Sequence, residues 1–101
     1  MLRLFQTNMK PWTVEPHFEN NPDPCFMFKH ALFHATKATG KVAGLADEHD
    51  HAGAKASPKE SFKESGKYLA DMVVCAMKMA SEAGIDLQDA LNARMVEKGL
   101  L

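Results

Sequence analysis

The chain has 101 residues, enough for one domain, and its 12 Lys and Arg nearly balance 13 Asp and Glu. This balance argues against a nucleic-acid-binding protein that relies on bulk positive charge. Hydrophobic residues make up 46% of the chain, as in soluble globular proteins, and no apolar run approaches the length of a membrane span. We read no secretion signal at the N-terminus, and two cysteines are too few for a disulfide scaffold. We therefore expect a reducing, cytoplasmic setting.

Residues 1–24 predict an irregular N-terminal arm. Four of the five prolines lie here, and proline fixes φ and removes a hydrogen-bond donor, so long regular elements are disfavoured. We expect at most a short helical turn, with the aromatic side chains of this arm packed on another part of the protein.

A first long helix is predicted from the residues that follow. Asp23 is a favourable N-cap and Pro24 suits the first helical position. From Cys25 to Leu45, apolar residues recur with the 3.6-residue period of an α-helix. Residues 46–56 are polar and predict a connection to the next helix.

Two further helices have clear start and stop signals. Ser57 and Glu60 match the capping-box pattern, which predicts a second long helix from Pro58, with a bend near Gly66 and an end near Gly84. Asp86 then caps a shorter third helix, which Gly99 ends. No alternating run makes a convincing strand. The sequence thus predicts an all-α fold, with the helical domain in residues 25–101.

Two stretches resemble a known family. Residues 69–95, LADMVVCAMKMASEAGIDLQDALNARM, and more loosely residues 31–43, ALFHATKATGKVA, are similar to the MazG-like all-α nucleotide pyrophosphohydrolases. The resemblance implies a MazG-like helical bundle. It also implies a homodimer or higher homo-oligomer, because members of this size resemble half of a four-helix bundle. The apolar composition and the wide apolar face of the second helix point the same way.

The resemblance also implies a chemistry, the hydrolysis of nucleoside triphosphates to monophosphate and pyrophosphate. That chemistry needs Mg²⁺, held by an E-E-x-x-E run and an E-x-x-D run, because hard cations require several carboxylate oxygens. The corresponding five positions here are Lys37, Ala38, Lys41, Tyr68 and Asp71, so only one acidic residue remains. We therefore expect a catalytically degenerate relative, a binding or interaction module without Mg²⁺-dependent hydrolysis and without assigned catalytic residues.

The substituted positions suggest a different kind of site. If the helices pack as in the family, the side chains of Lys37, Lys41, Lys67 and Tyr68 form an anion or nucleotide pocket. The same lysines could instead form ion pairs, and Lys67 has the i, i+4 spacing to Asp71 that suits one.

Two alternatives remain open. In the first, the chain is a nucleoside triphosphate pyrophosphohydrolase whose Mg²⁺ ligands are relocated to Asp71, Glu64, Asp47 and Glu48. In the second, it is a small metal-binding protein that uses the run of residues 47–51 or the pair His30 and His34, which share a helix face. Cys25 and Cys75 are expected to be inert thiols in apolar surroundings.

Overall fold

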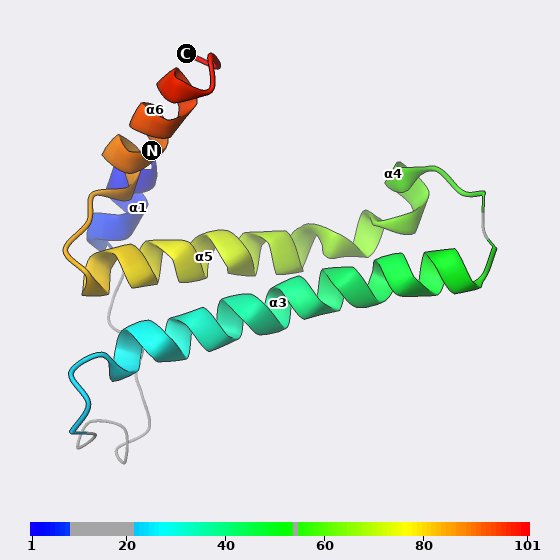
Figure 1. Ribbon diagram of the computed structural model, residues 1–101, viewed down its shortest axis with the longest axis horizontal. Coiled ribbons are helices and arrows are strands. Elements are labelled where there is room, and N and C mark those ends of the chain that lie inside the picture. Colours follow the sequence, from blue (N-terminus) through cyan, green and yellow to red (C-terminus); the bar gives the residue numbers. More distant parts are fainter. Residues whose placement is uncertain (9–21, 54) are drawn as a thin grey trace.

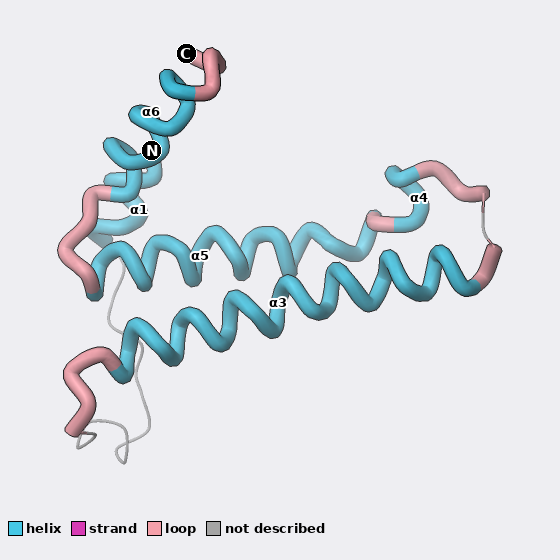
Figure 2. Tube along the Cα trace, viewed as in Figure 1, coloured by secondary structure: helices cyan, strands magenta, loops and turns pink. Residues whose placement is uncertain are grey.

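The computed structural model describes residues 1–8, 22–53 and 55–101, and within these ranges every regular element is helical. The all-α prediction is therefore confirmed for the described residues (Figure 1). The two longest helices, α3 (Phe26–His51) and α5 (Gly66–Glu82), lie side by side and run in opposite directions as a hairpin. The short helices α1 (Leu2–Asn8) and α6 (Leu87–Glu97) lie together at one end of this hairpin (Figure 2).

Helix α3 begins two residues later than the sequence predicts. Its N-cap is Cys25, which makes no side-chain capping bond, so the expected N-cap at Asp23 is wrong. The backbone oxygen of Asp23 instead accepts a hydrogen bond from the Phe26 amide in a turn. The carboxylate of Asp23 accepts from the Cys25 amide at 2.8 Å and pairs with Lys29 at 2.8 Å. Asp23 thus holds the turn before the helix.

The C-terminal end of α3 extends further than expected. Residues 46–51, predicted as part of a polar connection, are helical up to His51. Asp47 and His51 lie one turn apart with their Oδ1 and Nδ1 atoms 3.1 Å from each other, so this polar stretch stabilises itself locally. The chain leaves the helix at Gly53, whose φ of +60° suits glycine.

The predicted second helix is divided in two. Ser57 accepts a hydrogen bond from the Glu60 amide at 3.3 Å, which confirms the predicted cap of α4 (Pro58–Ser61). Helix α4 ends at Ser61, because the backbone of its C-cap, Phe62, leaves the helical region. The centroid of the Phe62 ring lies 6.4 Å from that of the His49 ring. A 3-10 turn, η1 (Lys63–Ser65), then leads into α5. Gly66 therefore begins α5 instead of bending a continuous helix.

The predicted ends of the last helices are confirmed. Gly84, with φ of +69°, follows α5, and Gly99, with φ of +72°, follows α6. The Asp86 carboxylate accepts a hydrogen bond from the Asp89 amide at 3.1 Å, as an N-cap should.

Helix α1 is longer than the short turn expected within the N-terminal arm. It is tied to the α5–α6 junction, because Arg3 contacts both Asp86 and Asp89, at 2.6 and 2.5 Å. Gln6 donates to the Ile85 carbonyl at 2.6 Å and accepts from the Leu87 amide at 3.1 Å. The prediction of irregular structure for residues 9–21 lies outside the described residues.

Most of the buried apolar side chains among the described residues are small. The buried apolar residues among those described are Ala31, Ala38, Cys75, Met77 and Ala80. Many larger apolar side chains in the same ranges stay exposed. None of the helices among the described residues is both long and apolar enough to cross a membrane.

Candidate functional site

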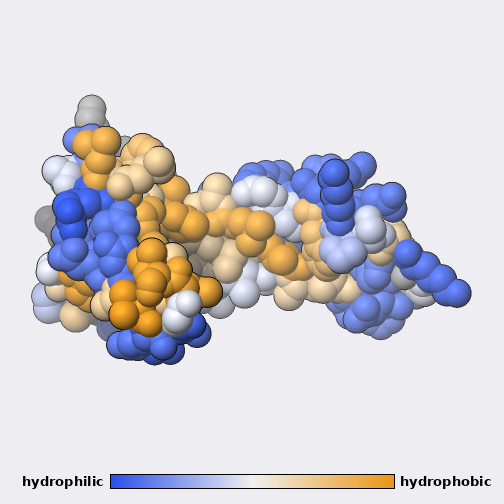
Figure 3. Space-filling view, turned by 90° about the horizontal axis from the view of Figure 1, so that it is seen from above, coloured by the Kyte–Doolittle hydropathy of each residue, from blue (hydrophilic) through white to orange (hydrophobic). Residues whose placement is uncertain are grey.

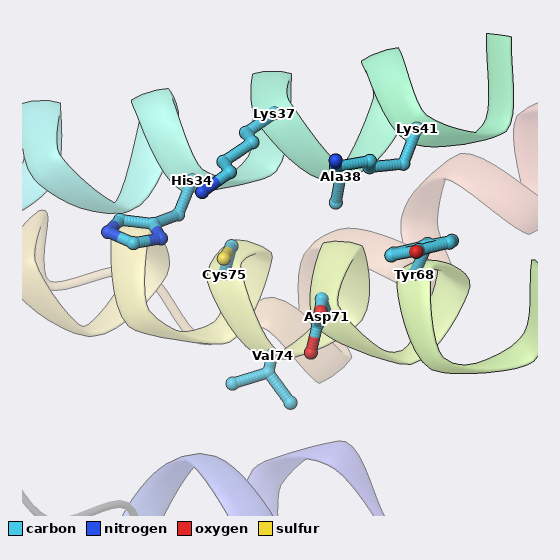
Figure 4. A pocket seen from close by; sticks show the side chains of 8 residues that line it. All are labelled: His34, Lys37, Ala38, Lys41, Tyr68, Asp71, Val74 and Cys75. Atoms are coloured by element: carbon cyan, nitrogen blue, oxygen red, sulfur yellow. The ribbon is translucent and has the colours of Figure 1, made fainter. Parts of the chain in front are cut away.

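A pocket of about 310 Å³ lies between α3 and α5, near the middle of the hairpin (Figure 4). Its lining residues come from both helices: His34, Lys37, Ala38, Lys41, Tyr68, Asp71, Val74 and Cys75. Four predicted site residues are among them, namely Lys37, Lys41, Tyr68 and Asp71. The volume is at the lower end of the range typical of small-molecule sites.

Helical spacing explains how each wall is formed. On α3, Lys37 follows His34 by three residues and Lys41 follows Lys37 by four, so all three lie on one side of the helix. On α5, Tyr68 and Asp71 are three residues apart, and they stand across from the lysines (Figure 4). Buried Ala38 lies between these groups, and its small side chain leaves room for the cavity.

The pocket is lined by more positively charged than negatively charged side chains. Asp71 is the one carboxylate among its lining residues, whereas Lys37 and Lys41 supply two ammonium groups. Asp71, Lys37 and Lys41 are all exposed to solvent, and no ion pair joins any two of these three residues. The lysine side of the pocket is therefore available to an anion.

Lys67, predicted to belong to the same pocket, does not line it. Its Nζ atom lies 5.1 Å from the centroid of the Tyr68 ring, a cation–π distance. The alternative expectation, an ion pair between Lys67 and Asp71, is also wrong, since Lys67 turns toward the ring. One residue along a helix corresponds to roughly 100° of rotation, which removes Lys67 from the pocket wall that Tyr68 occupies.

The relocated metal ligands are not brought together. Glu64, Asp47 and Glu48 do not line the pocket with Asp71, and Asp47 pairs with His51 in the last turn of α3. Among the described residues, no three His, Cys, Asp or Glu side chains are grouped as metal ligands would be. The residues present in the pocket therefore do not fit the Mg²⁺ site of the family.

The two histidines on α3 are neighbours, as their spacing predicts. The ring centroids of His30 and His34 are 4.5 Å apart in an edge-to-face arrangement. Burial lowers the pKa of His30 below its ordinary value, and the nearby His34 and Lys78 lower it further. Since the described residues hold no third ligand beside this pair, the geometry does not extend it into a metal centre.

The two cysteines differ from each other. Cys75 is buried, and burial, followed by the negative charge of Asp71, raises the pKa of its thiol, while Lys78 opposes this shift. A raised pKa keeps the thiol protonated near neutral pH, which agrees with the expectation of an inert side chain. Cys25 is exposed in the turn before α3, so its predicted apolar surroundings are wrong.

Sequence reasoning missed three side chains of the pocket, His34, Val74 and Cys75. Helical spacing could have found them, because His34 lies three residues before Lys37, and Val74 and Cys75 lie three and four residues after Asp71. Comparison of the chain with family models, with curated proteins and with solved structures finds no match.

Proposed function

We propose that the chain is a catalytically degenerate MazG-like binding module, which holds a small phosphate-bearing anion, such as a nucleotide, between α3 and α5. The observation that carries this proposal is the position of Lys37 and Lys41, which face a single carboxylate across the pocket. An ammonium group contributes donors and positive charge, which suit phosphate oxygens and repel a divalent cation.

The rest of the pocket suits an organic ligand as well as its phosphate. Tyr68 presents an aromatic ring and a hydroxyl group, and Val74 adds an apolar contact. Asp71 provides an acceptor opposite the lysines, which favours a ligand that carries a hydrogen-bond donor at the end away from its phosphate. These features support a nucleotide more than bare phosphate.

The family's Mg²⁺-dependent reaction is not supported by these residues. Hard cations are held through oxygen ligands, and this pocket supplies one carboxylate beside two lysines. We therefore derive no metal-dependent step for this chain. The module is expected to act as a homodimer in the cytoplasm, where its two free cysteines would stay reduced.

Turnover is tested by measuring pyrophosphate release from a panel of nucleoside triphosphates, with Mg²⁺ and with Mn²⁺, for the wild type and for Asp71→Ala. We expect no release above background from either protein. Wild-type turnover that disappears in Asp71→Ala would overturn the proposal and establish the pyrophosphohydrolase alternative.

Binding is tested by calorimetry with pyrophosphate and with nucleoside mono- and triphosphates, without divalent cations. The double variant Lys37→Ala/Lys41→Ala should bind at least about tenfold more weakly, because charged hydrogen bonds contribute about 1.5–3 kcal/mol each before solvent screening. Lys59→Ala/Lys63→Ala is the matched control, since it removes the same charge from exposed lysines outside the pocket. Equal weakening in both double variants would mean that only net charge attracts the anion.

A further inference from the structure

The α3 wall of the pocket holds a histidine beside its two lysines. His34 lines the pocket with Lys37 and Lys41, and it is exposed, so a ligand in the pocket can reach its ring. Figure 4 shows the ring directed from α3 toward α5, with the side chain of Lys37 extending toward it. The imidazole is therefore part of the surface that an anion would meet.

Helical geometry places these three groups along one side of α3. His34 and Lys41 are seven residues apart, which corresponds to about 10 Å along the helix axis, and Lys37 lies between them. Side chains on a helix lean toward its N-terminus, so both lysine side chains extend in the direction of His34. An anion held by Lys37 thus lies beside the imidazole of His34.

The protonation state of His34 decides what it offers to an anion. Neutral imidazole has one N–H donor and one acceptor nitrogen, whereas imidazolium has two donors and a positive charge. A hydrogen bond from a charged donor to a phosphate oxygen is about twice as strong as a neutral one. A bound anion would also offset the repulsion between the imidazolium and the ammonium group of Lys37. Binding of the anion therefore favours the protonated form of His34.

The charged and titratable groups near His34, among the described residues, come from α3 and α5. On α3 they are His30, Lys37 and Lys41. From α5, Tyr68, Asp71 and Cys75 line the facing wall, and Lys78 acts on the adjacent His30. Helix α4 packs on the opposite, hydrophilic end of the hairpin (Figure 3), and its contact at His49 is about four helical turns from His34.

Imidazole is the kind of group in this set that ordinarily changes charge between about pH 5 and 8. Carboxyl, phenol and ammonium groups ordinarily titrate outside this range. Burial, followed by the charge of Asp71, raises the pKa of the Cys75 thiol and so moves it further from neutral pH. His30 does not line the pocket. The charge of the pocket wall near neutral pH is therefore adjusted through His34.

We propose that His34 is a third phosphate-binding group of this pocket and that it binds in its protonated form, so that the pocket takes up a proton together with its anion. This inference rests on the proposed binding function and adds its dependence on pH. The contribution of His34 to affinity increases as pH falls through the range in which imidazole gains a proton, and it is lost as pH rises. The pocket thus holds its anion more tightly in mild acid than lysines alone would allow.

Calorimetry of the full chain with inorganic pyrophosphate, without divalent cations, tests this proposal at about pH 6 and about pH 8. The quantity compared is the affinity of the wild type divided by that of His34→Gln, because this ratio cancels the titration of pyrophosphate itself. The ratio should be at least about threefold larger at the lower pH, as for a charged hydrogen bond at a solvent-exposed site. The same ratio at both pH values would overturn the proposal.

Proton uptake is a second readout, which a purely structural role of His34 would not change. The heat of binding, measured in buffers with different ionisation enthalpies, gives the number of protons taken up. The wild type should take up more protons than His34→Gln, and equal uptake would contradict the proposal. His34→Arg carries a permanent charge, so it should exceed His34→Gln in affinity at both pH values. Equal affinities of these two variants at about pH 6 would also count against the proposal.

His30→Gln is the matched control, because it makes the same change on the same helix at a histidine outside the pocket. It should keep the wild-type increase in affinity in mild acid. Loss of this increase in His30→Gln, with its retention in His34→Gln, would assign the proton to His30 and refute the proposal.

Failure of this inference is distinguishable from failure of the binding function. If the wild type binds no pyrophosphate at either pH, both are overturned. If binding requires Lys37 and Lys41 but has the same pH dependence in the wild type and in His34→Gln, only the role of His34 is overturned.

Discussion

His30 lies between two rings on the same helix. Its ring centroid is 5.8 Å from that of Phe26, in a stacked arrangement, and 4.5 Å from that of His34. Burial disfavours the charged imidazolium, and the nearby His34 and Lys78 lower the pKa of His30 further. His30 is therefore held in its neutral form by the folded chain more than by the unfolded chain.

This lowered pKa predicts a loss of stability in mild acid. The contribution of His30 is fully present above its ordinary value of 6.5 and decreases as pH falls below it, because the unfolded chain then binds the proton more readily. The urea midpoint of the wild type should fall more between neutral and mildly acidic pH than that of His30→Gln. Parallel pH profiles for wild type and His30→Gln would contradict this account.

Single residues also show which parts of the site were predictable. Lys37, Lys41, Tyr68 and Asp71 meet in one pocket, as the family resemblance and helical spacing predict. Lys67 does not, because a difference of one residue decides which side of α5 a side chain occupies. Sequence alone does not show which side of α5 packs on α3, so Lys67 could not be separated from Tyr68 beforehand.

Among the helices, α1 is held by hydrogen bonds to the turn between α5 and α6 and to α6 itself. The side-chain amide of Gln6 satisfies a carbonyl at Ile85 and an amide at Leu87, which are backbone groups at the start of α6. The Gln88 side chain accepts from the Leu2 amide at 3.0 Å, so the contact is reciprocal. These bonds connect residues 79 to 86 positions apart in the chain.

Removal of this amide should release α1 without unfolding the hairpin. We expect Gln6→Ala to lower the free energy of unfolding by about 1 kcal/mol, the usual contribution of one or two such hydrogen bonds. Hydrogen exchange should accelerate at residues 2–8 and at Leu87, while the α3 and α5 amides keep their protection. Asn8→Ala, at an exposed position of the same helix, should change neither quantity. Faster exchange throughout α5 after Gln6→Ala would show that α1 supports the whole hairpin.

Whether a helix boundary could be predicted depends on whether the interactions that set it are local or come from another helix. The caps at Ser57 and Asp86 were predictable, because each carboxylate or hydroxyl group bonds an amide three residues away. The break at Phe62 was not, because it accompanies contacts with a distant helix. There the Phe62 ring approaches His49, and the Ser61 hydroxyl lies 2.7 Å from Nδ1 of His49. Local capping bonds thus set the starts of α4 and α6, whereas contacts with α3 accompany the division of the second helix.

In the molecule as a whole, the small side chains between α3 and α5 determine how closely the two helices pack and how much room the pocket offers a ligand. Ala38 is 5% exposed and belongs to the interior, and it also lines the pocket. A larger side chain at this position would push the helices apart and would occupy the space that a ligand needs. One residue therefore contributes to two properties of the protein.

Ala38→Leu should lower both the stability of the fold and the affinity of the pocket for an anion. Overpacking of a buried position destabilises a fold by about 1–3 kcal/mol, and the added side chain should also weaken anion binding by about tenfold or more. Chemical denaturation and calorimetry measure the two effects separately. Ala93→Leu, at an exposed position of α6, is the control with the same substitution and should leave both unchanged. Unaltered binding in Ala38→Leu would place the ligand outside this pocket.

The double role of Ala38 has a consequence for how this protein can change. Selection for a tighter hairpin and selection for a roomier ligand site would act on the same methyl group, so neither trait can be improved there without a cost to the other. In a mutant library, variants that gain heat resistance and variants that accept bulkier ligands should carry different residues at this position. Adaptation toward both traits would then proceed through positions of the two helices that lie outside the pocket and the buried interior.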